Sequence, residues 1–202
     1  MGVHIPKFAY KFVQKMMLDL KAYDSETYAH CVRGSERALR VSEELGQNRR
    51  EQAIAAYSGL LHDLGKMKIP LEILNKPDRL TAEEFEIVKK HAEWGADLIA
   101  PLQAVPFFKD VSSAIWHHHE RVDGQGYYGV PGDRIPFCSK IILVVDTVDA
   151  MTQDRAYRKG VSFDAACEEL IRCSGSQFET QVVDAFFDAF DEKRSRKTGI
   201  AA

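Results

Sequence analysis

Histidine and carboxylate side chains recur close together along this chain of 202 residues, which contains seven histidines. His62 and Asp63 are adjacent, and Glu26 stands four residues before His30, a spacing that places both on one face of a helix. Asp146 interrupts the most apolar run, where burying a carboxylate is costly unless a cation or a charged hydrogen bond compensates it. The candidate metal ligands are Glu26, His30, His62, Asp63, His91, His118, His119 and Asp146.

The number and type of these ligands indicate the kind of metal site. Eight ligands exceed what one divalent ion needs, and mixed imidazole and carboxylate ligation suits iron, manganese or zinc. The four cysteines form no C-x-x-C pair, which favours reduced thiols over a cysteine zinc site or a disulfide framework. We therefore expect a catalytic centre with two or three divalent transition-metal ions, iron or manganese, and room for water.

Three consecutive histidines end one predicted helix, and they cannot all face one centre. Neighbouring helical residues are about 100° apart, so three of them span roughly 200°. His117 is interpreted as a core or solvent-exposed residue. His118 and His119 can both reach a metal only if the helix ends there, and the glycine-rich loop that follows favours such an end.

The composition is that of a globular domain with a substantial core. Hydrophobic residues make up 45% of the chain and charged residues 28%, which excludes disordered and low-complexity classes. The net charge of −3 provides no electrostatic footprint for DNA or RNA. Because no apolar run reaches the roughly 18 residues of a membrane span, we expect a cytoplasmic protein without a membrane partner.

Apolar spacing and capping residues predict helices joined by short turns. Thr81 with Glu84 forms a capping box, and Phe8, Phe12 and Phe85 fall on the expected apolar faces. The predicted helices cover residues 7–23, 25–45, 50–64, 82–99, 109–119, 138–151, 162–173 and 180–193. Residues 66–80 and 123–136 are predicted loops.

No alternating strand pattern is present, so the expected fold is a single all-α domain of helical-bundle type. Residues 1–23 are expected to form an N-terminal amphipathic helix, residues 24–192 the catalytic domain, and residues 193–202 a basic tail.

Five motifs together resemble the HD-GYP family, a branch of the HD superfamily of metal-dependent phosphohydrolases. The resemblance runs from about Asp24 to Phe190, and its spaced polar residues make it highly specific. The motifs are HDLGK (62–66), KKHAEWGADLI (89–99), HHERVDGQGY (118–127), GDRIPFCSKIILVVDTVDAMTQDRAYRKG (132–160) and GSQF (175–178).

The resemblance implies a centre of two or three metals that hydrolyses cyclic di-GMP to the linear dinucleotide or to GMP. The positions that match the family's metal ligands are His62, Asp63, His91, His118, His119 and Asp146. His30 matches the family's helical histidine, Glu26 the carboxylate that supports a third metal in some members, and Lys66 the lysine beside the metals. The positions that match substrate contacts are Tyr127, Asp149, Arg155 and Arg158.

The expected reaction follows from these parts. Metal binding lowers the pKa of water, so a hydroxide shared by two metals would attack phosphorus in line. Asp63 would bridge the metals, and Lys66 would neutralise charge that develops in the transition state. Arg155 and Arg158, three residues apart, would hold the second phosphate or a guanine edge.

One departure from the family lies at Gly126-Tyr127-Tyr128, where the family has Gly-Tyr-Pro. Proline fixes φ and removes a donor, so Tyr128 in its place has two interpretations. In one, the loop is looser and turnover slower, and Tyr128→Pro would speed turnover. In the other, the Tyr128 ring packs on the surface of an already ordered loop, and Tyr128→Pro would lower activity or stability. The loop of residues 123–136 is also an expected contact for a protein partner.

Two alternative functions follow from the same residues. One is a metal-bearing cyclic-dinucleotide receptor with low turnover, which the altered loop favours. The other is an HD phosphohydrolase that acts on another nucleotide, although His91, His118 and His119 exceed what the smallest HD enzymes use. Most family members carry a sensory domain, and the sequence decides neither whether one accompanies this domain nor whether it forms a homodimer.

Overall fold

The computed structural model describes residues 4–154 and 159–190, and within these ranges its regular secondary structure is helical apart from one isolated bridge between Ser174 and Phe178. The α-helices are α1 (Lys7–Tyr23), α2 (Ser25–Glu44), α3 (Arg49–Leu61), α4 (Leu71–Leu74), α5 (Ala82–Lys89), α6 (His91–Leu98), α7 (Pro106–Trp116), α8 (Phe137–Thr152), α9 (Phe163–Cys173) and α10 (Thr180–Phe190). The 3₁₀-helices η1 (Leu64–Lys68), η2 (Ala100–Leu102) and η3 (Gly132–Arg134) lie in the connections. The predicted all-α class is confirmed.

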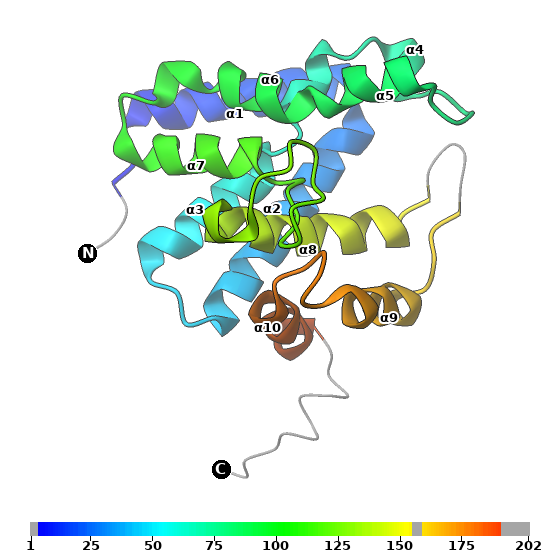
Figure 1. Ribbon diagram of the computed structural model, residues 1–202. Helices are drawn as coiled ribbons and strands as arrows, with labels where there is room; N and C mark the ends of the chain where they lie inside the picture. Colours follow the sequence, from blue (N-terminus) through cyan, green and yellow to red (C-terminus); the bar gives the residue numbers. More distant parts are fainter. Residues whose placement is uncertain (1–3, 155–158, 191–202) are drawn as a thin grey trace.

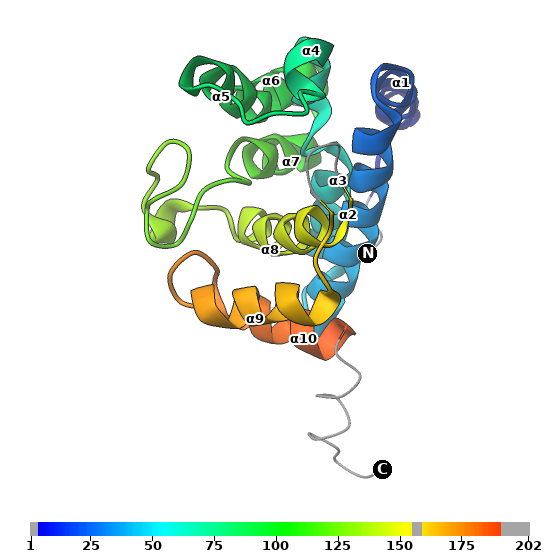
Figure 2. The same ribbon diagram turned by 90° about the vertical axis from the view of Figure 1, so that its right-hand side faces the viewer.

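The helices form a stack that α2 crosses (Figure 1). Turned by 90°, α6, α7, α8 and α9 lie one below another, and α2 runs along their edge (Figure 2). One hydrophobic cluster joins α8, α9 and α10, and a second joins α1, α6 and α7. Because α2 and α3 contribute buried residues to both clusters, these two helices hold the stack together.

The helix signals read from the sequence are largely present. The Asp24 side chain accepts the backbone N–H groups of Glu26 and Thr27 at the start of α2, and Thr81 and Glu84 form the predicted capping box of α5. The apolar run that holds Asp146 is the buried helix α8, as predicted. None of the helices described is long and apolar enough to cross a bilayer.

Three predicted helices end differently, and the difference matters for the site. The helix predicted over 50–64 ends at Leu61, the one predicted over 82–99 is divided at Lys90, and the one predicted over 109–119 begins at Pro106 and ends at Trp116. Each early end places a histidine at or just after a helix terminus. The predicted loop over 66–80 contains η1 and the short α4.

Two predictions about buried aromatic residues were wrong. The exposed fraction of Phe8 is 58% and that of Phe85 is 45%. On α1 the buried stripe is Ala9, Val13, Met17 and Leu20, so the helix turns Phe8 away from the core. The short helix α5 has no fully buried residue, and Phe85 stands at the surface beside the site described next.

Candidate metal centre

Two groups of side chains from distant segments converge at the middle of the stack. The first, here called the carboxylate half, consists of His30 from α2, His62 from the end of α3 and Asp146 from α8. The His30 Nε2 atom lies 3.1 Å from His62 Nε2 and 3.0 Å from Asp146 Oδ1. His30 is 7% exposed and His62 1%, so these ligand atoms face each other away from bulk solvent.

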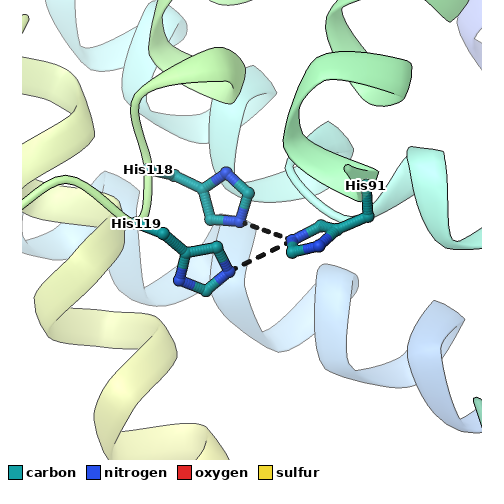
Figure 3. Close-up of side chains that lie close together, drawn as sticks. All are labelled: His91, His118 and His119. Carbon is teal, nitrogen blue, oxygen red and sulfur yellow. Dashed lines mark hydrogen bonds between the residues drawn. The ribbon is translucent and has the colours of Figure 1, made fainter. Parts of the chain in front are cut away.

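The second group, the histidine half, consists of His91, His118 and His119 (Figure 3). The Nε2 atom of His91 lies 3.2 Å from that of His118 and 3.1 Å from that of His119. Because α7 ends at Trp116, His118 and His119 belong to a turn and both point at His91. His117 instead bonds through Nδ1 to the Ser113 carbonyl oxygen, outside the group, as expected.

Asp63 lies between the two halves. Its Oδ1 atom is 3.3 Å from His91 Nε2, and its Oδ2 atom is 3.5 Å from both His30 Nε2 and His62 Nε2. Lys66 Nζ lies 2.6 Å from the same Oδ2 atom. The carboxylate thus presents one oxygen to each half, which is the arrangement that a bridge between two metal ions requires.

Hydrogen bonds fix which nitrogen of each ring faces the centre. The Nδ1–H groups of His62, His91 and His118 donate to the carbonyl oxygens of Gly59, Val88 and Ile115, at 2.9, 2.6 and 2.6 Å. Each Nε2 atom is then a bare acceptor. Acceptors about 3 Å apart repel one another unless a cation lies between them, so the donor set fits a metal ion.

Burial sets the protonation of the histidine half. Burial lowers the pKa of His91 to about 4 and that of His119 to about 3, and burial with the neighbouring His119 holds the pKa of His118 well below its usual range. These rings are therefore neutral near pH 7, which is the form that binds metals.

In the carboxylate half, burial also lowers the pKa of His62, but His30 behaves differently. Burial alone would lower the pKa of His30, but hydrogen bonds to Asp146 and Asp149 raise it to about 9. Burial would raise the pKa of Asp63, yet the positive charges of Lys66 and of protonated His30 hold it well below its usual range. The carboxylates around His30 therefore stabilise a positive charge in the carboxylate half, either a proton on His30 or a bound cation.

Asp149 lies behind His30 and also lines the cavity beside it. Its Oδ2 atom accepts the His30 Nδ1–H at 2.7 Å and Arg33 at 2.7 Å, and Arg37 also donates to the carboxylate. The Asp149 side chain is 1% exposed. Through its bond to Nδ1, Asp149 orients His30, a candidate ligand.

Arg33 and Arg37 were missed in the sequence, although a signal was present. They follow His30 by three and seven residues, so all three share one face of α2. Two arginines on the face that carries a candidate ligand indicate a buried carboxylate opposite.

The loop after the histidine half is ordered by one buried carboxylate. Glu120, 1% exposed, accepts the backbone N–H groups of Tyr128 at 2.8 Å and Val130 at 2.9 Å. The Tyr128 ring stacks on Trp116 at 4.6 Å between centroids. Of the two interpretations of Tyr128, the structure therefore favours the packed ring on an ordered loop, because its N–H and its ring both have partners. Glu120 was not identified from the sequence.

The remaining predicted site residues divide into three groups. Tyr127 stacks on His119, with ring centroids 4.4 Å apart. Glu26, exposed on α2, lines a cavity of about 100 Å³ together with His30, Lys66 and Asp149, but it does not join either ligand group. Arg155 and Arg158, like the basic tail of residues 193–202, lie outside the described residues.

Close helix approaches bring the ligands together. A Cβ atom at Gly59 would lie 2.7 Å from the Gly34 carbonyl oxygen, and one at Gly65 would lie 2.0 Å from the His91 carbonyl oxygen. Glycine is therefore required where α2 crosses α3, beside His30 and His62, and where η1 meets α6, beside Asp63 and His91.

This fold and these two ligand groups define an HD domain. Residues 13–182 match the protein family described as HD domain, and the chain belongs to that family. Within it, the chain is related to the HD-GYP cyclic di-GMP phosphodiesterases, as the sequence motifs predicted.

Three similar proteins illustrate the relationship. A cyclic di-GMP phosphodiesterase of Pseudomonas aeruginosa is 36% identical over 174 residues, which cover 86% of this chain and 41% of that protein. A 3'3'-cGAMP-specific phosphodiesterase of Vibrio cholerae is 31% identical over 176 residues, which cover 86% and 33%. The solved structure of an HDG"Y"P protein from Bdellovibrio bacteriovorus covers 91% of this chain and 61% of its own, with a TM-score of 0.65 at 20% identity. The chain spans less than half the length of the two curated relatives.

Proposed function

We propose that this domain is a metal-dependent phosphodiesterase that hydrolyses cyclic di-GMP. The observation that carries the proposal is Asp63, whose two carboxylate oxygens face two separate ligand groups while Lys66 lies 2.6 Å away. Two divalent ions held there, iron or manganese, would lower the pKa of a bound water and polarise the phosphate.

The side chains have distinct tasks in this proposal. His30, His62 and Asp146 hold one ion, His91, His118 and His119 hold the other, and Asp63 is shared. Lys66 places its ammonium beside the reacting phosphate and stabilises charge that develops in the transition state. Asp149 positions His30 through its Nδ1–H. Four residues are proposed to contact the substrate: Tyr127, Asp149, Arg155 and Arg158.

The first experiment measures metal content and hydrolysis in the same samples. The protein is purified with and without air, reconstituted with iron or manganese, and assayed for ions per chain and for cyclic di-GMP cleavage. We expect two or three ions and turnover to the linear dinucleotide or GMP. A fully loaded protein that cleaves no cyclic dinucleotide would support the receptor function instead.

The second experiment tests the lysine. Lys66→Ala should lower kcat about a hundredfold with a smaller change in KM, as for loss of one electrostatic donor. Lys68→Ala is the matched control, because Lys68 is exposed in the same 3₁₀-helix. Equal effects of the two substitutions would remove Lys66 from the mechanism.

A third ion is proposed to bind near Glu26. The spacing of Glu26 to His30 and their shared cavity support this assignment. Glu26→Ala should lower the metal content by up to one ion, whereas Glu36→Ala, an exposed carboxylate on the same helix, should not. Unchanged stoichiometry in a three-ion protein would exclude Glu26 as a ligand.

A mixed cyclic dinucleotide is the second candidate substrate. The similarity to a 3'3'-cGAMP-specific phosphodiesterase favours it. Parallel measurement of kcat/KM for cyclic di-GMP and 3'3'-cGAMP decides between them.

A further inference from the structure

A second cleft adjoins the candidate metal centre and has no role in the chemistry above. It has a volume of about 540 Å³ and lies against α5 and the segment before it. Lys66 lines both this cleft and the cavity beside His30, and its Nζ atom is 2.6 Å from Asp63 Oδ2. A group held in the cleft would therefore lie one lysine side chain away from the candidate metal ligands.

One wall of the cleft is suited to a flat ring. Phe85 is 45% exposed, and the aliphatic side chains of Leu80 and Val88 also line the space. The rings of Phe85 and Tyr127 meet nearly at right angles with centroids 6.0 Å apart, and Tyr127 stacks on His119 at 4.4 Å. A row of rings thus leads from the histidine half to the cleft. An accessible aromatic face of this kind stacks well on nucleobases.

The rim of the cleft is held in place by Glu84. Its carboxylate accepts Lys76 Nζ at 2.7 and 2.8 Å and the Thr81 backbone N–H at 2.7 Å. The segment between these two anchors is therefore fixed at both ends. It carries Asp78 and Arg79, both exposed and both lining the cleft.

Asp78 presents a carboxylate to this space. Within residues 4–154 and 159–190 its side chain has no hydrogen-bonding or ion-pair partner. A carboxylate has only acceptor atoms, so it matches an edge that carries two donors. The Watson–Crick edge of guanine offers N1–H and N2–H₂ side by side, whereas that of adenine places an acceptor at N1.

We infer that this cleft is the nucleobase subsite of the enzyme, in which Phe85 stacks on a purine and Asp78 selects guanine over adenine. The inference rests on the proposed cyclic-dinucleotide hydrolysis and adds to it the residue that determines base specificity. Phe85 contributes affinity for either purine, and Asp78 contributes the difference between them.

Equilibrium binding tests the assignment apart from catalysis. Isothermal titration calorimetry on chelator-treated protein, in which no turnover occurs, compares cyclic di-GMP with cyclic di-AMP. The wild-type protein should favour cyclic di-GMP, and Asp78→Asn should reduce that preference about tenfold, as for loss of one bidentate base contact. Phe85→Ala should lower the affinity for both ligands by a similar factor, about tenfold.

Glu72→Gln is the matched control, because Glu72 is an exposed carboxylate on the neighbouring α4 that does not line the cleft. It should change neither affinity. The kcat/KM ratio of the two ligands in metal-loaded protein gives a second, independent reading of the same preference. Circular dichroism verifies that each variant is folded.

Two results would overturn the inference. One is that Asp78→Asn leaves the ratio of the affinities for cyclic di-GMP and cyclic di-AMP unchanged, whether or not both affinities fall. The other is that the wild-type protein binds the two ligands equally well. Failure of the proposed function is recognised separately. Metal-loaded protein that cleaves bis(p-nitrophenyl) phosphate but no cyclic dinucleotide would refute the assigned substrate, while base preference would still be read from binding.

Discussion

The two halves of the candidate metal centre use similar rings in contrasting surroundings. The carboxylate half lies among formal charges, with Asp146 and Asp149 against His30 and with Arg33 and Arg37 behind them. The histidine half has carbonyl oxygens behind two of its rings and an aromatic ring on the third.

This contrast teaches that one centre can offer two different metal environments. Carboxylate ligands suit manganese, whereas imidazole ligands suit iron or zinc, so the half that includes Asp146 should differ in metal preference from the half made of three imidazoles. Asp63 is the group that both halves share, and it couples them.

The largest effect is expected from removing the shared carboxylate. Asp63→Ala should reduce kcat by roughly 10⁴-fold, as for other groups that act as a unit, and should lower the metal content of both halves. Asp110→Ala, at an exposed ion pair with Arg50, is the control. Elemental mass spectrometry measures the ions per chain, and a turnover assay measures kcat. Loss of only one ion would show that Asp63 belongs to one half alone.

The next effect concerns the close approach beside Asp63. Gly65→Ala places a methyl group 2.0 Å from the His91 carbonyl oxygen and should destabilise the metal-free protein by about 3 kcal/mol, the upper range for overpacking. Gly34→Ala, whose Cβ would lie 3.2 Å from the Gly59 carbonyl oxygen, should cost less. Urea denaturation measures both. A larger loss in Gly34→Ala would mean that the crossing of α2 and α3 is the tighter constraint.

A smaller effect should be confined to the carboxylate half. Asp149→Asn removes the charge that orients His30 and should weaken one metal site about 10- to 100-fold while the other keeps its affinity. Stepwise competition with a chelator measures the two sites, and Asp133→Asn, an exposed residue in η3, serves as the control. Equal weakening of both sites would contradict the separation of the halves.

The smallest effect is expected at the loop beside the histidine half. Tyr128→Phe should change stability and turnover little, because its hydroxyl lies 3.4 Å from the Lys89 carbonyl oxygen, at the limit of a hydrogen bond. Tyr128→Pro should instead reduce both, by about 1 kcal/mol or more, because it removes the donor to Glu120 and the ring on Trp116. Faster turnover in the proline variant would support the alternative interpretation, in which Tyr128 leaves this loop flexible.

The sequence predicted the all-α fold and the residues that gather at the centre, because spaced polar residues within apolar helices have few structural explanations. It did not predict where the helices end. Helical periodicity continues through His62, His91 and His118, whereas the structure interrupts the helix at or just before each of them. Tertiary contacts, such as the fit of Gly65 against His91, decide those ends and leave no periodic signal.

The positions around the ligands were harder to foresee for the same reason. The bonds of Asp149 to Arg33 and Arg37 were not foreseen, because these partners come from a helix more than a hundred residues earlier. Glu120 looked like one more charge in a loop, since nothing local shows that it is buried beneath Tyr128 and Val130.

Three of the rings, those of His62, His91 and His118, share a bond to the carbonyl oxygen three residues before them. This bond joins near neighbours in the chain, so it holds each ring in place once the tertiary contacts have set the helix end, and it requires no ion. The direction of each of these three rings is then fixed before an ion binds. Loading and release of an ion would therefore proceed at the speed of ligand exchange, without any helix melting and reforming around it.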